Sequence, residues 1–106
     1  MTSTWKHTEL RICRLLGMER NGAQGAEGPD CDCDWLAVEV KHRARVPKFL
    51  TQTLAKVRRQ AGADRLGIMV LHEHGSAGDD DLVIMALSDF ADWYGGGSDD
   101  RPTAGA

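Results

Sequence analysis

One stretch of seven residues, from Trp35 to Lys41, most strongly limits what this chain can fold into. Apolar Leu, Val and Val occupy positions 36, 38 and 40, whereas positions 37, 39 and 41 hold Ala, Glu and Lys. Successive side chains of an extended strand point to opposite faces. The stretch therefore predicts a strand with one apolar face and one face that carries Glu39 and Lys41.

Segments with helical periodicity precede and follow this strand. A first helix is predicted over about Trp5–Gly17, and a second opens with Pro47 as its first residue and runs to about Ala61, where Gly62 stops it. The apolar runs 66–72 and 82–87 are typical of central strands, and Ser88 can cap a short last helix. The order of helix, strands, helix, strand, strand and helix predicts an α/β layered fold.

The chain of 106 residues is expected to form a single domain over residues 1–94. The end, residues 95–106, is rich in Gly, Asp and Ser and is predicted to be a disordered tail. The apolar runs are too short to span a bilayer, so no membrane association is expected. The N-terminus shows no secretion signal.

Three cysteines, Cys13, Cys31 and Cys33, bear on the cellular compartment. An odd count predicts a reducing, cytoplasmic environment and no disulfide scaffold. The Cys31-x-Cys33 spacing is not that of a usual structural zinc site. Burial as small apolar side chains is the expected fate of these residues.

The charge distribution is uneven although the net charge is only −3. Between Lys41 and Arg65 there are eight basic residues and one acidic residue, Asp64. Such a cluster predicts a local positive surface on an acidic protein, suited to phosphate groups of nucleic acid. The expected DNA-contacting residues are Arg20, Arg43, Arg45, Lys48, Lys56 and Arg59.

Carboxylates occur at three places that suit a metal site. Glu9 lies in the middle of the apolar stripe of the first helix, where a carboxylate loses water and needs a cation or hydrogen-bond donors. Pro29-Asp30 precedes Glu39-Val40-Lys41 by eight residues. Carboxylates and a backbone carbonyl, here that of Val40, are ligands that hard divalent cations prefer. A lysine on the same strand face can orient a water and offset phosphate charge.

This combination resembles the PD-(D/E)XK nuclease superfamily, and within it the small phage and archaeal Holliday junction resolvase-like proteins. The resemblance rests on Glu9, the Gly-rich loop that starts at Arg20, Pro29-Asp30, the run Trp35 to Arg43 and the basic second helix with Gln52. It implies a restriction endonuclease-like core, in which a mixed central β-sheet is flanked by helices. It also implies a Mg²⁺- or Mn²⁺-dependent endonuclease that leaves a 5′-phosphate and a 3′-hydroxyl.

Carried over by position, the resemblance makes Glu9, Asp30 and Glu39 the acidic metal-site residues, Lys41 the catalytic lysine and Gln52 a helper. It implies a homodimer that cuts branched or four-way-junction DNA in a bacterial or phage-infected cell. The alternation of Asp30, Asp32 and Asp34 leaves open which aspartate binds metal. Two other functions stay open: a nuclease for flaps, nicks or duplex DNA, and an inactive DNA-binding or assembly protein with the same fold.

Overall fold

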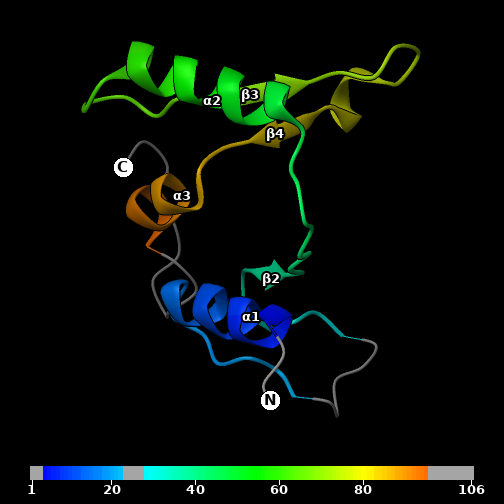
Figure 1. Ribbon diagram of the computed structural model, residues 1–106, viewed down its shortest axis with the longest axis vertical. Helices are drawn as coiled ribbons and strands as arrows, with labels where there is room; N and C mark the ends of the chain where they lie inside the picture. The colour runs from blue at the N-terminus through cyan, green and yellow to red at the C-terminus, as the bar shows by residue number, and fades with distance from the viewer. Residues whose placement is uncertain (1–3, 23–27, 96–106) are drawn as a thin grey trace. The chain divides into compact units, whose positions relative to one another are not determined.

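The computed structural model describes residues 4–22 and 28–95 (Figure 1). The chain divides into two compact units, unit 1 with residues 1–44 and 90–106 and unit 2 with residues 45–89. Most of the predicted tail, residues 96–106, lies outside the described residues. The elements are α1 (Thr4–Leu15), β1 (Cys31–Asp32), β2 (Ala37–Val38), α2 (Lys48–Ala61), β3 (Met69–Leu71), the 3-10 helix η2 (Gly78–Asp80), β4 (Leu82–Ile84) and α3 (Leu87–Tyr94).

Helix α1 of unit 1 ends two residues before the predicted stop at Gly17. Gly17 adopts a φ of 80°, which a residue without a Cβ tolerates. Its N–H bonds to the carbonyl of Arg14 at 3.0 Å, and the next N–H, of Met18, bonds to that of Cys13 at 2.8 Å. These two bonds form a Schellman motif, which ends the helix and turns the chain back across it.

Strands β1 and β2 form an antiparallel ladder in unit 1, with Cys31 opposite Val38. Bonds from Asp30 N–H to the Val38 carbonyl and from Cys33 N–H to the Leu36 carbonyl, both 2.8 Å, extend the pairing at either end. The predicted strand over 35–41 is thus regular only at its centre. Its alternation nevertheless holds, because positions 36, 38 and 40 are half-buried and positions 37, 39 and 41 are exposed.

The cysteines correct one expectation. Cys13 of α1 and Cys31 of β1 are joined as a disulfide, with their Cα atoms 6.0 Å apart, whereas the odd count predicted none. Both are fully buried, as expected, and with Leu16 and Met18 they make up the buried apolar core found in the described residues. Cys33 remains a free thiol. Spacing along the chain is a poor guide here because pairing depends on the distance between the folded segments.

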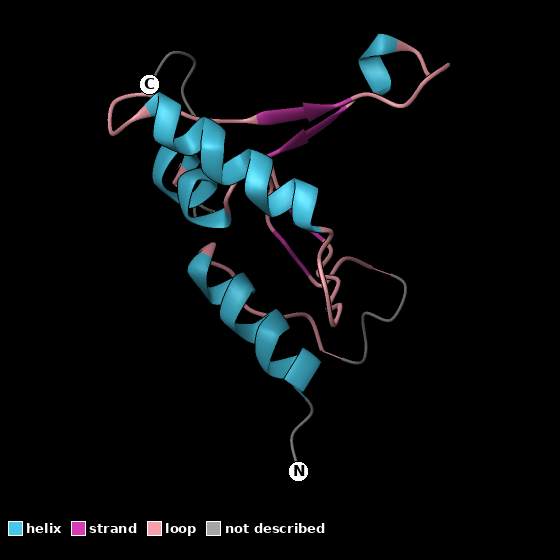
Figure 2. Cartoon of the chain, turned by 45° about the horizontal axis from the view of Figure 1, so that its top comes forward, coloured by secondary structure: helices cyan, strands magenta, loops and turns pink. Residues whose placement is uncertain are grey.

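Unit 2 consists of α2 against an antiparallel hairpin of β3 and β4 (Figures 1 and 2). Helix α2 begins at Lys48, one residue after the predicted start at Pro47, and ends at Ala61 before Gly62, as predicted. Its predicted inner stripe is half-buried, namely Leu50, Leu54, Val57 and Ala61. In the hairpin Met69 faces Ile84, Val70 faces Val83 and Leu71 faces Leu82.

Glycine permits a close approach between α2 and the start of the hairpin. A Cβ added at Gly67 would lie 2.9 Å from the carbonyl oxygen of Val57 and 3.0 Å from the Cα of Arg58.

Side-chain pairs hold other parts of unit 2 together. Arg58 donates to Asp89 at 2.8 Å, and His72 Nδ1 lies 2.6 Å from an oxygen of Asp81 at the end of the hairpin loop.

The predicted strands therefore pair in two separate two-stranded ladders within residues 4–22 and 28–95, both antiparallel. No parallel pair occurs in those ranges. A mixed sheet contains both parallel and antiparallel pairs, so the mixed central sheet remains a prediction. None of the helices in the described part of the chain has the length and apolar character needed to cross a membrane.

Candidate active site

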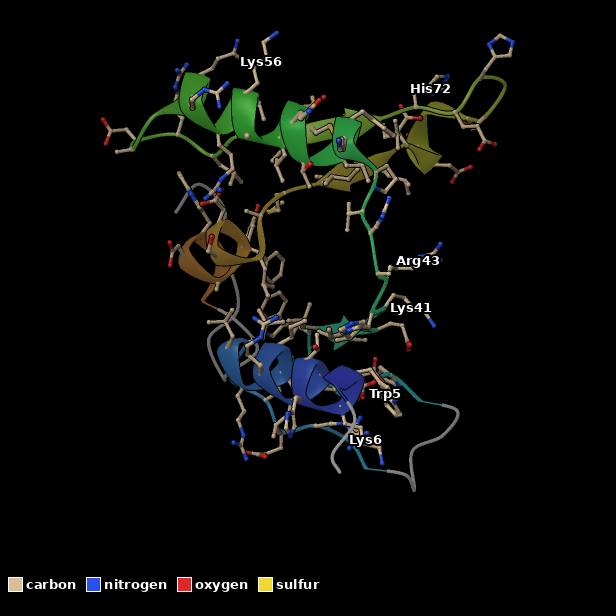
Figure 3. The ribbon with its side chains drawn as sticks, viewed as in Figure 1. Trp5, Lys6, Lys41, Arg43, Lys56 and His72 are labelled. Atoms are coloured by element: carbon tan, nitrogen blue, oxygen red, sulfur yellow. A yellow bond between two sulfur atoms is a disulfide. The ribbon has the colours of Figure 1, made fainter. Side chains whose placement is uncertain are left out.

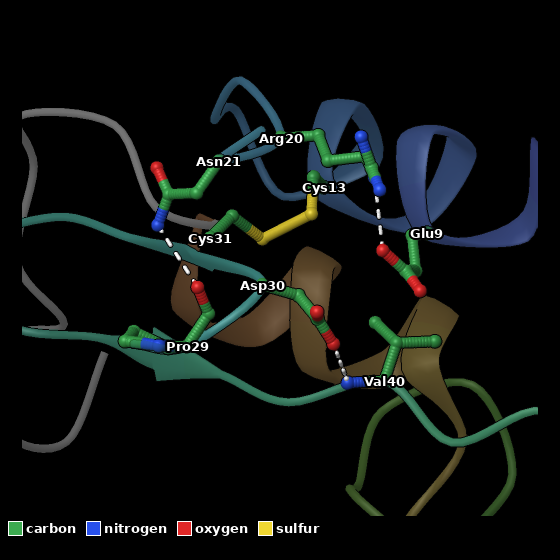
Figure 4. Close-up of polar contacts among 8 residues, drawn as sticks. All are labelled: Glu9, Cys13, Arg20, Asn21, Pro29, Asp30, Cys31 and Val40. Carbon is green, nitrogen blue, oxygen red and sulfur yellow. Dashed lines mark hydrogen bonds and ion pairs between the residues drawn. A yellow bond between two sulfur atoms is a disulfide. The ribbon is translucent and has the colours of Figure 1, made fainter. Parts of the chain in front are cut away.

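Asp30 is held firmly at the entry to β1. Its Oδ2 accepts a hydrogen bond from the backbone N–H of Val40 at 2.6 Å, and its own carbonyl accepts one from Asn21 N–H at 2.7 Å (Figure 4). The residue is half-buried, and its N–H is bonded to the carbonyl of Val38. A carboxylate that accepts a backbone N–H forms a strong, charge-assisted bond, so Asp30 ties two chain segments together.

Glu9 is the one charged residue that is buried in the described part of the chain, with 8% of its surface exposed. Arg20 Nε donates to its Oε1 at 2.9 Å, and the two side chains keep 24% and 10% of their surfaces exposed. The position of Glu9 in an apolar stripe predicted that its carboxylate needs a cation or hydrogen-bond donors, and Arg20 supplies the cation. Arg20, expected to contact DNA, turns its guanidinium to Glu9 instead.

The segment around Val40 contacts both Asp30 and the start of α1, the helix that carries Glu9. Thr8 Oγ1 lies 3.3 Å from His42 Nδ1, which brings the start of α1 beside the end of the 35–41 stretch. Figure 4 shows the Asp30 carboxyl group at the backbone N–H of Val40 and the Glu9 carboxyl group bonded to Arg20. The Cys13–Cys31 disulfide reinforces this arrangement, because Cys13 follows Glu9 by about one helical turn and Cys31 follows Asp30 directly.

Glu39 and Lys41 lie on the outer face of the same stretch. Lys41 Nζ is 3.4 Å from Glu39 Oε2, and the two side chains keep 79% and 54% of their surfaces exposed. Alternation of side chains turns both away from the half-buried side of Val40. An exposed pair of this kind contributes little to stability, which leaves both groups available for chemistry.

The three carboxylates do not form one cluster. Within residues 4–22 and 28–95, no three side chains of Asp, Glu, His or Cys are arranged so that they could hold a metal ion. The structure bonds Asp30 to the Val40 N–H, pairs Glu9 with Arg20 and leaves Glu39 paired with Lys41. The full metal-ligand set stays a prediction.

The three alternating aspartates have different surroundings. Asp30 is half-buried and bonded to Val40, whereas Asp32 and Asp34 are exposed. Asp32 Oδ1 accepts a hydrogen bond from the exposed side chain of Asn21, whose Nδ2 lies at 3.1 Å. Because Asp30 is half-buried and bonded to the Val40 N–H, we retain it as the candidate metal ligand.

The other predicted residues are distributed over both units. Arg43 is exposed and belongs to unit 1. Gln52, the expected helper, is exposed on α2 in unit 2, and its catalytic role stays a prediction. The remaining expected DNA contacts are also exposed and belong to unit 2, namely Arg45, Lys48, Lys56 and Arg59.

Sequence reasoning missed one residue beside the site, Trp5. Its ring lies 6.0 Å from Arg20 Cζ and 5.5 Å from Lys6 Nζ, and the residue is 46% exposed. The helical periodicity assigned Trp5 to the buried stripe with Glu9. The sequence did contain a signal for a position beside Glu9. Trp5 precedes Glu9 by four residues, and residues at this spacing lie on the same face of a helix.

Comparison with known proteins gives no relative: no family model, no curated protein and no solved structure matches the chain. The residues and their geometry therefore carry the functional argument.

Proposed function

We propose that the chain is a metal-dependent, structure-selective DNA endonuclease of the Holliday junction resolvase type, acting as a homodimer. The observation that carries the proposal is the hydrogen bond from the Val40 backbone N–H to the Asp30 carboxylate, while the Thr8–His42 contact holds the start of α1, which carries Glu9, beside this segment. That backbone segment lies between Glu39 and Lys41, the acidic and basic residues of the sequence motif.

The donor chemistry around Val40 fits a hard divalent cation. Glu9 and Asp30 offer carboxylate oxygens, Val40 offers a carbonyl oxygen, and Glu39 offers a third carboxylate from the outer face. In the structure Glu9 is bonded to Arg20 and Glu39 is paired with Lys41, so both would have to turn from these partners to complete a site for Mg²⁺ or Mn²⁺. A cation held there would supply Lewis-acid chemistry to a phosphodiester oxygen and would lower the pKa of an attacking water.

Lys41 is suited to act on the phosphate side of the reaction. Its ammonium group lies 3.4 Å from Glu39. Because the Lys41 side chain is largely exposed, a phosphate can reach the ammonium group without any change in the backbone. There the ammonium orients the water and offsets negative charge on the phosphate. Arg43, two residues further on, is exposed and adds a guanidinium that fits phosphate geometry.

Cleavage of a labelled four-way junction in Mg²⁺ tests the proposal. Glu39→Ala and Lys41→Ala should each lower the cleavage rate by roughly a hundredfold or more while folding and DNA binding persist. Glu73→Ala, which removes an exposed carboxylate of unit 2, serves as the matched control and should cleave normally. Full activity of either site variant would contradict the mechanism. Flap, nicked and duplex substrates in the same assay identify the preferred DNA structure.

One observation favours a second candidate, a DNA-binding or assembly protein of the same fold without catalysis. The described residues contain no ready-made group of three metal ligands. A titration with Mn²⁺ separates the two candidates. If the chain is a nuclease, it should bind Mn²⁺, and Asp30→Asn should weaken this binding. If it is the inactive protein, no Mn²⁺ binding that depends on Asp30 is expected.

A further inference from the structure

An exposed tryptophan lies beside the candidate active site and has no role in the mechanism above. Trp5 starts the described side chains of α1 and is 46% exposed, although tryptophan is usually well buried. A large exposed aromatic side chain with cations around it is typical of surfaces that bind a partner.

The indole of Trp5 is supported from within unit 1. Arg20 Cζ lies 6.0 Å from the ring centroid, and the same guanidinium is bonded to the buried Glu9 at 2.9 Å. Because Glu9 fixes Arg20, Arg20 in turn limits the movement of the indole. An indole held in this way loses little conformational entropy when a planar ligand stacks on it.

The surroundings of Trp5 favour an anionic ligand. Lys6 Nζ lies 5.5 Å from the ring on an exposed side chain, so it can turn toward a phosphate. Figure 3 shows Arg43, Lys41, Trp5 and Lys6 along one side of unit 1, and the Thr8–His42 contact ties the two segments that carry them. A flat aromatic ring bordered by cations fits a nucleobase and its phosphates.

We infer that Trp5 is a stacking platform for an unpaired nucleobase of branched DNA, next to the phosphate that the candidate active site would cut. This inference rests on the proposed function and adds to it a substrate class. A base inside a continuous duplex is covered on both faces by its neighbours, whereas a base at a branch point or bulge offers a face to the indole. Trp5 therefore selects branched or bulged DNA over plain duplex.

A duplex oligonucleotide with one unpaired fluorescent adenine analogue tests the inference, with the full-length chain and EDTA to prevent cleavage. The wild-type chain should quench the analogue on binding, because stacking on indole quenches it. Trp5→Ala should remove the quenching and weaken binding of this probe by roughly 5- to 100-fold, while binding of the perfectly paired duplex changes less than about twofold. Trp5→Phe should retain part of both effects.

Trp93→Ala is the matched control, because Trp93 is also exposed, at 40%, and lies on α3. It should leave the quenching and both affinities unchanged. Equal losses for the paired and the unpaired probe, or wild-type binding without quenching, would overturn the inference and leave the proposed nuclease intact. A wild-type chain that binds neither probe would overturn both.

Discussion

Loss of the Cys13–Cys31 disulfide should destabilise the protein strongly. The bond closes a loop with a sequence separation of 18 residues. In the chain-entropy model, a cross-link over a loop of this length stabilises the folded state by about 3 kcal/mol, because it restricts the unfolded chain. Small domains have total stabilities of about 5–15 kcal/mol, so the bond supplies a large share. For a domain of this size the melting temperature should fall by roughly 10–20 °C.

Thermal unfolding followed by circular dichroism, with and without a dithiol reductant, measures this effect. Cys13→Ser/Cys31→Ser should unfold at the lower temperature in both conditions. Cys33→Ser is the matched control, since Cys33 is a free thiol, and it should behave as the wild type does. A thiol assay in denaturant should find one reactive thiol before reduction and three after it. Three thiols before reduction, or equal melting temperatures with and without the bond, would refute the reasoning.

Urea unfolding of further variants tests three contacts in the two units. Arg20→Met leaves the buried Glu9 without its cation and should cost about 3 kcal/mol, whereas the Glu9→Met/Arg20→Met double variant should recover part of that loss. Gly67→Ala places a Cβ against the backbone of α2 and should cost roughly 1–3 kcal/mol. Asp30→Ala removes the acceptor for the Val40 N–H and should cost about 1–3 kcal/mol, whereas Asp30→Asn should keep stability and lose cleavage.

Each of these predictions has an outcome that contradicts it. A double variant no more stable than Arg20→Met would show that the penalty is not that of an unpaired buried charge. Gly67→Ala within about 0.5 kcal/mol of wild type would mean that α2 does not press on this position. Asp30→Asn with full cleavage would remove Asp30 from the metal site.

The sequence predicted the parts of the fold that depend on local periodicity. The bounds of α2 follow from Pro47 and Gly62, because proline fits the start of a helix and glycine commonly ends one. The alternation around Val38 and Val40 was also predicted, since it depends only on the strand geometry. The strands themselves are shorter than expected, because ladder bonds require a partner strand that periodicity does not reveal.

The contacts in the candidate site were less predictable. The position of Glu9 in an apolar stripe indicated that it needs a cation, yet only the fold identifies Arg20 as that cation. The disulfide was missed because an odd number of cysteines says nothing about which two meet. The exposure of Trp5 was not predicted, because a tryptophan at helical spacing usually belongs to a core.

The hydrogen bond from Val40 N–H to Asp30 turns one backbone amide into a reporter of events at the carboxylate. A cation that binds Asp30 withdraws electron density from the oxygen that this amide already uses. The amide resonance of Val40 should therefore shift during an NMR titration with Mg²⁺, in proportion to occupancy and without any substrate. A shift of this one resonance would therefore report Mg²⁺ at Asp30, and an unchanged resonance at saturating Mg²⁺ would remove Asp30 from the proposed metal site.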